Sequence, residues 1–241
     1  MKLAILTTET SHHAFFVREM SSHYSEVRVF CETDSRKAPF ETRHLIDELC
    51  VDHENNLWFE GKSKRLAEFA ETCFFPTMND ASAIRELTDY CPDAIIVFGT
   101  GKLKLDALAV QKRFSLNLHG GDPEEYRGLD SHLWAIYHGE FCRLVTTLHT
   151  LNGELDDGEI VLQSEVELGQ NMQIHELRAA NTRLCVKLAS SALAIIERWG
   201  ELPSRPQRQK GRYYSAMPSE LKEICRHKFY KFTSKIVKER I

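Results

Sequence analysis

The residues whose types and spacing best suit chemistry are Asn117 and His119, at the end of the apolar segment 114–119. Alternate side chains of a strand point to the same face, so these two would lie next to each other. Histidine exchanges a proton near neutral pH, and an asparagine amide can donate a hydrogen bond to a developing oxyanion. The pair therefore predicts acid–base chemistry, although both residues could instead cap the strand and bond to backbone.

A turn rich in carboxylates, residues 153–158, follows a second apolar segment that ends in Thr147-Leu148-His149. Asp156 and Asp157 lie in this turn. A carboxylate at that place could pair with His119 and hold its ring in a useful orientation. The alternative is an ordinary Asp-Gly turn on the surface.

Alternating strand and helix patterns would position these groups. Apolar segments predict strands at residues 3–7, 27–31, 93–98, 114–119, 144–150 and 160–168. Helical spacing predicts helices at 12–22, 105–111, 129–138 and 173–199, around Leu66, Phe69 and Phe74, and around Ile84 and Leu87. This alternation predicts an α/β domain with a largely parallel sheet, in which ligands bind beyond the carboxyl ends of the strands.

Composition limits the class of protein. The chain has 241 residues, 42% hydrophobic, with a formal net charge of -4. This length and composition suit one soluble α/β domain with a short appendage, or two small domains. The charge gives no general attraction to nucleic acid or to membranes. The seven cysteines form no C-x-x-C pair, which favours reduced thiols in a cytoplasmic protein. No apolar run reaches the ~18 residues that a membrane span requires.

Three patterns suggest other functions but are incomplete. Gly99-Thr100-Gly101-Lys102 follows a strand but lacks the glycine spacing of a phosphate loop. His119-Gly120-Gly121 is similar to a lipase oxyanion motif, but the sequence has no G-x-S-x-G segment. The eleven histidines form no known metal-ligand motif, so we expect no metal.

Five short motifs in order carry a family resemblance. They are Asn117-x-His119, Tyr126-Arg127-Gly128, Trp134-Ala135-Ile136, Thr147-Leu148-His149, and Leu155-Asp156-Asp157-Gly158 followed by an apolar strand and Gln163. Together they resemble the 10-formyltetrahydrofolate-dependent formyltransferases, which include methionyl-tRNA, glycinamide ribonucleotide and sugar N-formyltransferases. The resemblance is most specific from residue 93 to 163.

The resemblance implies a Rossmann-like, mostly parallel sheet flanked by helices, and a catalytic trio of Asn117, His119 and Asp156. It also implies an N-formyltransferase whose formyl donor is 10-formyltetrahydrofolate. The residues that it assigns to the folate pocket are Phe98, Gly99, Thr100, Gly101, Lys102, Leu103, Ser115, Leu151 and Asn152.

Within this family, residues 119–136 and 211–218 are similar to sugar N-formyltransferases that act on nucleotide-linked amino sugars, the GDP-perosamine type among them. That subgroup implies a role in lipopolysaccharide O-antigen biosynthesis and a homodimer. The segment 8–13 lacks the glycines of the glycinamide ribonucleotide enzymes, and the residues after Trp199 are too few for a tRNA-binding barrel. We therefore expect a small substrate and no nucleic acid. The alternatives are another small amine, such as a siderophore hydroxyornithine or glycinamide ribonucleotide, and a non-catalytic folate or sugar-nucleotide binding module.

Candidate residues for the sugar nucleotide are His12, His13, Gly120, Gly121, Glu124, Tyr126, Arg127, Asp130 and Ser131. Tyr126 could stack on a ring, and Arg127 could pair with a phosphate or form a structural bond to a carboxylate. His12 and His13 begin a helix, where an anion could be held.

We expect a catalytic domain at residues 1–203 and a C-terminal extension at 204–241, made of a hairpin or loop and a basic helix. A basic run of this kind is more often a solvated helix face than a nucleic-acid site. Its aromatic residues could instead pack on the catalytic domain or on a second subunit.

Overall fold

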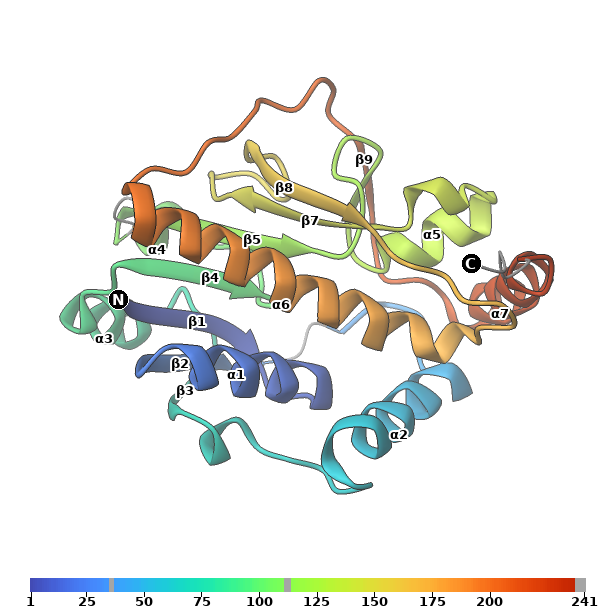
Figure 1. Cartoon of the computed structure of the whole chain (residues 1–241), viewed down its shortest axis with the longest axis horizontal. Coiled ribbons are helices and arrows are strands. Elements are labelled where there is room, and N and C mark those ends of the chain that lie inside the picture. The colour runs from blue at the N-terminus through green and yellow to red at the C-terminus, as the bar shows by residue number, and fades with distance from the viewer. Residues whose placement is uncertain (35–36, 111–113, 237–241) are drawn as a thin grey trace.

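The computed structural model describes residues 1–34, 37–110 and 114–236 (Figure 1). Its centre is a seven-stranded sheet in the order β3-β2-β1-β4-β5-β7-β8. The strands are β1 Lys2–Thr8, β2 Glu26–Glu32, β3 Glu71–Phe75, β4 Ala94–Phe98, β5 Phe114–His119, β7 Val145–Thr150 and β8 Ile160–Glu165. The strands from β3 to β5 pair in parallel, and β7 and β8 run antiparallel. The predicted α/β fold with a mostly parallel sheet is therefore confirmed.

Helices cover both faces of the sheet, because alternate residues of the inner strands are apolar on both sides. In β1, Leu3 and Ile5 pack under helices α1 (Ser11–His23) and α6 (Ile174–Trp199). Ala4 and Leu6 face the opposite layer, with α3 (Ala81–Tyr90) and α4 (Leu105–Ala109). Helix α2 (Leu45–Phe59) packs against α1 and α6 (Figure 1).

The helix expected around Leu66, Phe69 and Phe74 is wrong. Residues 66–68 form one short 3-10 turn, η1, and Glu71–Phe75 form the edge strand β3. Pairing with β2 along the strand and packing of Phe75 on Phe30 outweigh the local helical spacing. The helix around Ile84 and Leu87 is confirmed as α3. In the predicted helix 105–111, residues 105–109 are helical and Gln111 lies outside the described residues.

A second, two-stranded sheet joins the C-terminal extension to the middle of the chain. Strand β6 (Tyr126–Gly128) pairs in parallel with β9 (Arg212–Tyr214). Of the hairpin or loop expected in the extension, the structure has a loop, and its one short strand pairs with residues more than eighty positions earlier. Helix α7 (Ser219–Thr233) then packs against α5 (Ser131–His138), and Phe229 is fully buried there. A one-turn 3-10 helix, η2 (Phe141–Arg143), leads from α5 to β7.

Helix α6 is long and apolar enough to pass a length-and-composition test for a membrane span. Half of its most apolar window is buried inside the domain, and it lies along the sheet beside α1 and α2 (Figure 1). The central helix of a folded α/β domain passes the same test, so this feature is accounted for by core packing.

Candidate active site

The predicted chemical residues meet where β5 and β7 lie side by side. Asn117 and His119 end β5, and Asn117 is directly opposite His149 on the antiparallel strand β7. Asp156 comes from the turn between β7 and β8. His119, His149 and Asp156 are all buried. The sequence-predicted trio is thus brought together, with His149 as a fourth member.

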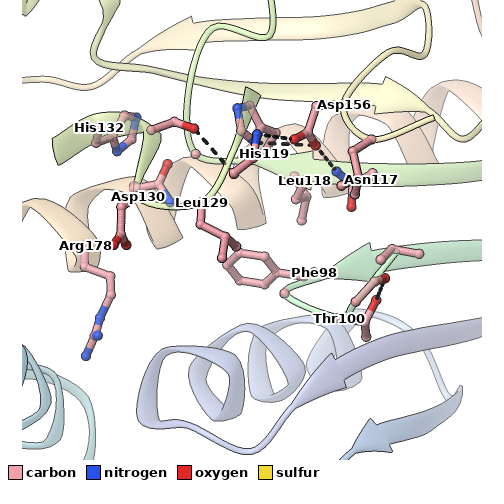
Figure 2. Close-up of a pocket in the computed structure, with 18 of the residues that line it drawn as sticks. Phe98, Thr100, Asn117, Leu118, His119, Leu129, Asp130, His132, Asp156 and Arg178 are labelled. Carbon is pink, nitrogen blue, oxygen red and sulfur yellow. Dashed lines mark hydrogen bonds and ion pairs between the residues drawn. The ribbon is translucent and has the colours of Figure 1, made fainter. Parts of the chain in front are cut away.

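The carboxylate of Asp156 is the centre of this group (Figure 2). Its Oδ1 accepts a hydrogen bond from Asn117 Nδ2 at 3.3 Å and lies 3.5 Å from both His119 Nδ1 and His149 Nε2. Its Oδ2 accepts the backbone N–H of Gly128 at 2.8 Å. A buried carboxylate with this many donors around it is well stabilised in its charged form.

The pKa of Asp156 reflects the balance of two opposing effects. Burial by itself would raise this pKa, but the charge of His119, the hydrogen bond with His149 and the Gly128 N–H together hold it well below its ordinary value. Asp156 is therefore an anion at neutral pH, available as a hydrogen-bond acceptor or a proton acceptor.

Backbone carbonyls fix the orientation of both imidazole rings. His119 Nε2 donates to the Tyr126 carbonyl at 2.8 Å, and His149 Nδ1 donates to the Thr150 carbonyl at 2.8 Å. His149 Nε2 lies 3.0 Å from Asn117 Nδ2 and 3.5 Å from Asp156 Oδ1. It accepts from Asn117 when the ring is neutral and donates toward Asp156 when the ring is protonated. Sequence reasoning assigned no role to His149, although its place on the strand beside Asn117 could have indicated one.

The turn that carries Asp156 depends on a tight backbone path. Asp156 itself has a left-handed conformation, with φ of 49°. Two residues later, a Cβ added to Gly158 would lie 1.6 Å from the carbonyl oxygen of Thr150, so only glycine fits there. The chain thus holds the Asp156 carboxylate in place through a strained residue and an obligatory glycine.

All four residues line a cavity of about 400 Å³. Most residues assigned to the folate pocket line it too: Phe98, Gly99, Thr100, Gly101, Lys102, Leu103, Leu151 and Asn152. Ser115 does not line it and is buried in β5, where its hydroxyl has no hydrogen-bond partner among the described residues. We name the lining residues 98–103, 151 and 152 the donor lobe.

The residues assigned to the sugar nucleotide divide into two groups. Those that line the cavity are His12, His13, Gly120, Asp130 and Ser131; those that lie outside its lining are Gly121, Glu124, Tyr126 and Arg127. Gly121 instead allows close packing, because an added Cβ would lie 2.8 Å from His119 Nε2. Glu124 forms a two-point ion pair with Arg205 of the C-terminal extension.

Tyr126 and Arg127 have structural partners in place of the expected ligand. The Tyr126 hydroxyl donates to Glu140 at 2.8 Å, and its ring stacks on Tyr214. Arg127 is buried and donates to the backbone carbonyl of Leu155. Arg127 Nη2 also lies 3.6 Å from the Asp157 carboxylate, which is the structural bond given as the alternative to phosphate pairing. Both side chains therefore have protein partners where a sugar or phosphate was expected.

His12 and His13 lie in the cavity wall without a permanent positive charge. Burial lowers the pKa of both imidazoles, which keeps them neutral. The cation on this side is Arg178 of α6, which sequence reasoning missed because nothing local distinguishes it from other arginines of an amphipathic helix. Its Nε and Nη2 donate to the fully buried Glu54 at 2.6 and 3.0 Å.

Arg178 Nη1 has no hydrogen-bond partner among the described residues, and Arg178 lines the cavity. We name the lining residues His12, Asp130, Ser131 and Arg178 the acceptor lobe. Figure 2 shows Phe98 and Thr100 on one side of the cavity and Asp130 and Arg178 on the other. No cluster that could hold a metal ion occurs in the described part of the chain.

The sheet and its buried Asn–His–Asp group define an α/β enzyme with a site suited to acyl transfer. A family model described as formyl transferase matches residues 2–193. The chain therefore belongs to the formyl transferase family, whose formyl donor is formyltetrahydrofolate.

Relatives with a stated activity extend this comparison. The methionyl-tRNA formyltransferase of Alkaliphilus oremlandii is 28% identical over 155 residues, which are 64% of this chain and 49% of that protein. The methionyl-tRNA formyltransferase of Clostridium acetobutylicum is 35% identical over 100 residues, 41% of this chain and 32% of that protein. The chain thus spans about a third to a half of the length of these curated relatives.

Solved structures share the fold at lower identity. The formyltransferase PseJ from Anoxybacillus kamchatkensis, in complex with UDP-4,6-dideoxy-4-formamido-L-AltNAc and tetrahydrofolate, has a TM-score of 0.55 and 19% identity. The match covers 89% of this chain and 86% of that chain. A 4-N formyltransferase from Francisella tularensis has a TM-score of 0.61 and 14% identity, over 89% of this chain and 76% of that one.

Proposed function

We propose that this protein transfers the formyl group of 10-formyltetrahydrofolate to the amine of a nucleotide-linked amino sugar. In this proposal it works in the cytoplasm, as a homodimer, in the biosynthesis of a surface polysaccharide such as O-antigen, and a GDP-perosamine type of acceptor is the first to test. The observation that carries the proposal is that the Asn117–His119–Asp156 group lines the same cavity as both lobes.

The donor lobe suits a flat heteroaromatic ring. Phe98, Leu103 and Leu151 supply apolar surface, and the loop 99–102 brings main-chain groups to the cavity. Gly99, with φ of 89°, allows this loop to pass close to the His13 ring. A pterin needs this combination of apolar contact and backbone hydrogen bonds.

The acceptor lobe suits a polar molecule with an anionic group. Arg178 is held by Glu54 through two of its nitrogens, which leaves Nη1 able to bond a phosphate oxygen. Ser131 and Asp130 offer a hydroxyl and a carboxylate for sugar hydroxyls. A diphosphate bound by Arg178 would leave the sugar amine to reach toward His119 and Asp156.

In the proposed reaction the amine attacks the formyl carbon, and a new C–N bond forms as the carbonyl oxygen becomes an oxyanion. Asn117 and protonated His119 stabilise this oxyanion, and Asp156 takes the proton of the amine directly or through water. Collapse breaks the bond from the formyl carbon to N10 of the folate, which leaves as tetrahydrofolate after protonation. Both N–H groups of Asn117 are engaged with His149 and Asp156, and the ring nitrogens of His119 face the Tyr126 carbonyl and Asp156. Donation to the oxyanion therefore requires each of these side chains to exchange one partner.

The test is a substrate panel. The protein is incubated with 10-formyltetrahydrofolate and GDP-, UDP- or dTDP-linked amino sugars, and tetrahydrofolate is followed over time. We expect tetrahydrofolate to appear with one class of nucleotide sugar only. Release without any amine would contradict the proposal in favour of a hydrolase, and no release with any acceptor would favour a binding module.

The same panel contains hydroxyornithine, glycinamide ribonucleotide and charged initiator tRNA. The tRNA arm is needed because the curated relatives are named methionyl-tRNA formyltransferases. A higher kcat/KM for any of these three than for every nucleotide sugar would overturn the proposed acceptor while leaving formyl transfer intact.

A further inference from the structure

The segment Arg205–Met217 crosses the active-site loops, and we name it the C-terminal strap. Its first contact is at Arg205, whose backbone exchanges two hydrogen bonds with Ile160 at the start of β8, at 2.8 and 2.9 Å. Its last is at Met217, whose N–H donates to the Asp130 carboxylate at 2.8 Å. The strap therefore joins the turn before β8 to the loop before α5, the two segments that flank the catalytic group.

Gln207 of the strap reaches the residue that carries the catalytic carboxylate. Its Nε2 donates to the backbone carbonyls of Asp156 and Gly158, both at 2.9 Å. These two bonds bracket the strained turn in which Asp156 has a positive φ. Both amide protons of Gln207 are used in this way, and its Oε1 is buried without a partner among the described residues. Within the described residues, every hydrogen bond of this side chain is therefore made to the Asp156 turn.

The strap also supports His119 from the other side. Strand β9 pairs with β6, and the Tyr126 carbonyl of β6 is the acceptor of the His119 Nε2–H. The pairing is close, because a Cβ on Gly128 would lie 2.2 Å from the carbonyl oxygen of Tyr214. Strand β9 of the strap therefore fixes the Tyr126 carbonyl that binds the His119 ring, and Gln207 of the strap fixes the turn that carries Asp156.

We propose that Gln207 of the C-terminal strap is a positioning residue, which sets Asp156 against His119. Gln207 does not line the cavity. It acts through the backbone of Asp156, so its loss is expected to misplace the carboxylate while leaving both substrate lobes intact. Small displacements of a catalytic group reduce turnover more than they reduce substrate binding.

The strap offers a matched control residue. Gln209 is the same residue type two positions later, and its Nε2 also makes two hydrogen bonds, to the Glu124 carbonyl at 3.2 Å and to the Glu125 carboxylate at 2.8 Å. Neither bond reaches the Asp156 turn. If the strap only stabilises the fold, Gln207→Ala and Gln209→Ala should have similar effects.

The kinetic experiment compares the wild-type full chain with Gln207→Ala and Gln209→Ala, using the acceptor that the substrate panel identifies. We expect Gln207→Ala to lower kcat about tenfold with both KM values changed less than about twofold, and Gln209→Ala to keep kcat within about twofold. The melting temperatures should fall by similar small amounts. A kcat for Gln207→Ala within twofold of the wild type, or an equal loss in Gln209→Ala, would overturn the proposal.

A third variant tests the hydrogen bonds directly. In Gln207→Glu an ionised side chain places oxygens against two carbonyl oxygens, whereas the protonated form regains one donor. The activity of this variant relative to the wild type should therefore rise as pH falls from about 8 to about 5.5. A ratio that stays constant with pH would contradict the proposed hydrogen bonds.

The kinetic experiment rests on the proposed function, so a second measurement is chosen that does not depend on formyl transfer. The side-chain ¹⁵N signals of His119 and His149 are compared in labelled wild type and in both alanine variants, without substrate. We expect Gln207→Ala to shift both sets of signals and Gln209→Ala to leave them in place. If the wild type transfers formyl to no acceptor, the proposed function fails while this comparison still decides whether Gln207 positions the site, and unmoved signals in Gln207→Ala would overturn that role.

Discussion

Replacement of Asp156 by asparagine tests the site most directly. The wild-type carboxylate lies 3.5 Å from His119 Nδ1. A pair of unit charges at that distance interacts by about 5 kcal/mol at an effective dielectric constant of about 20. Asparagine keeps one acceptor oxygen but has no charge, so we expect about 3–4 kcal/mol of transition-state stabilisation to be lost, a fall in kcat of roughly 10²- to 10³-fold.

The structure also predicts how Asp156→Asn fails. Both carboxylate oxygens accept hydrogen bonds in the wild type, one of them from the Gly128 N–H at 2.8 Å. In asparagine one of the two oxygens is replaced by an NH₂ group, which then faces either the Gly128 N–H or the Asn117 amide. The side chain of the variant therefore loses one hydrogen bond in either orientation. The measurement is kcat and both KM values from tetrahydrofolate formation, with the melting temperature as a check on folding.

Asp157→Asn is the matched control. Asp157 is the neighbouring carboxylate, but its partners are Arg127 at 3.6 Å and Lys210 at 3.7 Å, and it does not line the cavity. We expect its replacement to leave kcat within about threefold, because its side chain does not line the cavity. A fall of less than tenfold in Asp156→Asn, or an equal fall in Asp157→Asn, would refute the role assigned to Asp156.

Four further outcomes are expected. Asn117→Ala should lower kcat about a hundredfold with little change in melting temperature, and a loss under threefold would remove Asn117 from the mechanism. Arg178→Gln should raise the KM for a nucleotide-linked acceptor about tenfold and leave the folate KM unchanged, whereas equal effects on both KM values would argue against an acceptor lobe. Gly158→Ala should give no soluble folded protein, because its Cβ would lie 1.6 Å from a backbone oxygen; a folded variant with normal activity would show that the turn can rearrange. Glu124 is the pH-dependent case: its ion pair with Arg205 lowers its pKa from 4.5 to about 2, so it stabilises the fold above pH 4.5 and loses this effect as pH falls toward 2. Because Arg205 is partly exposed, solvent screening reduces the free energy that this ion pair contributes. In urea unfolding, Glu124→Gln should be less stable than the wild type by about 1–2 kcal/mol at pH 7 and equally stable near pH 2. A stability difference that does not change with pH would contradict this.

Local pattern predicted most of the sheet, because each inner strand is a short apolar run that ends at polar or glycine residues. The segment Ala94–Phe98 is buried along its whole length and lies beside β5, as its composition predicts. Residues 66–75 were the failure: their apolar spacing fits a helix, but the edge strand β3 gains hydrogen bonds to β2 that no local pattern records. The difference lies in long-range pairing, which outweighs weak local preference.

The candidate site was predictable where one strand carries its residues. Asn117 and His119 share a face of β5 by simple alternation, and Asp156 lies in the next obvious turn. His149 and Arg178 were missed because their roles arise from tertiary neighbours: His149 lies opposite Asn117 only once β5 and β7 pair, and Arg178 faces the cavity only once α6 crosses the sheet. Tyr126 gave the opposite error, since an aromatic residue near a site suggests stacking until its own partners are known.

The C-terminal extension shows why a domain boundary drawn from sequence can mislead about function. The family match ends at residue 193, and the prolines at 203 and 206 predict a linker. Yet Gln207 donates a hydrogen bond to the backbone carbonyl of Asp156, and β9 pairs with the strand whose carbonyl accepts from His119. Residues 2–193 therefore contain Asn117, His119 and Asp156 but not all the contacts that hold them in place, and Tyr213 of the strap also lines the cavity. If Gln207 acts as proposed, the smallest active unit of this protein extends beyond residue 193 into the strap, which is tied to the domain from Arg205 to the Met217 N–H that donates to Asp130.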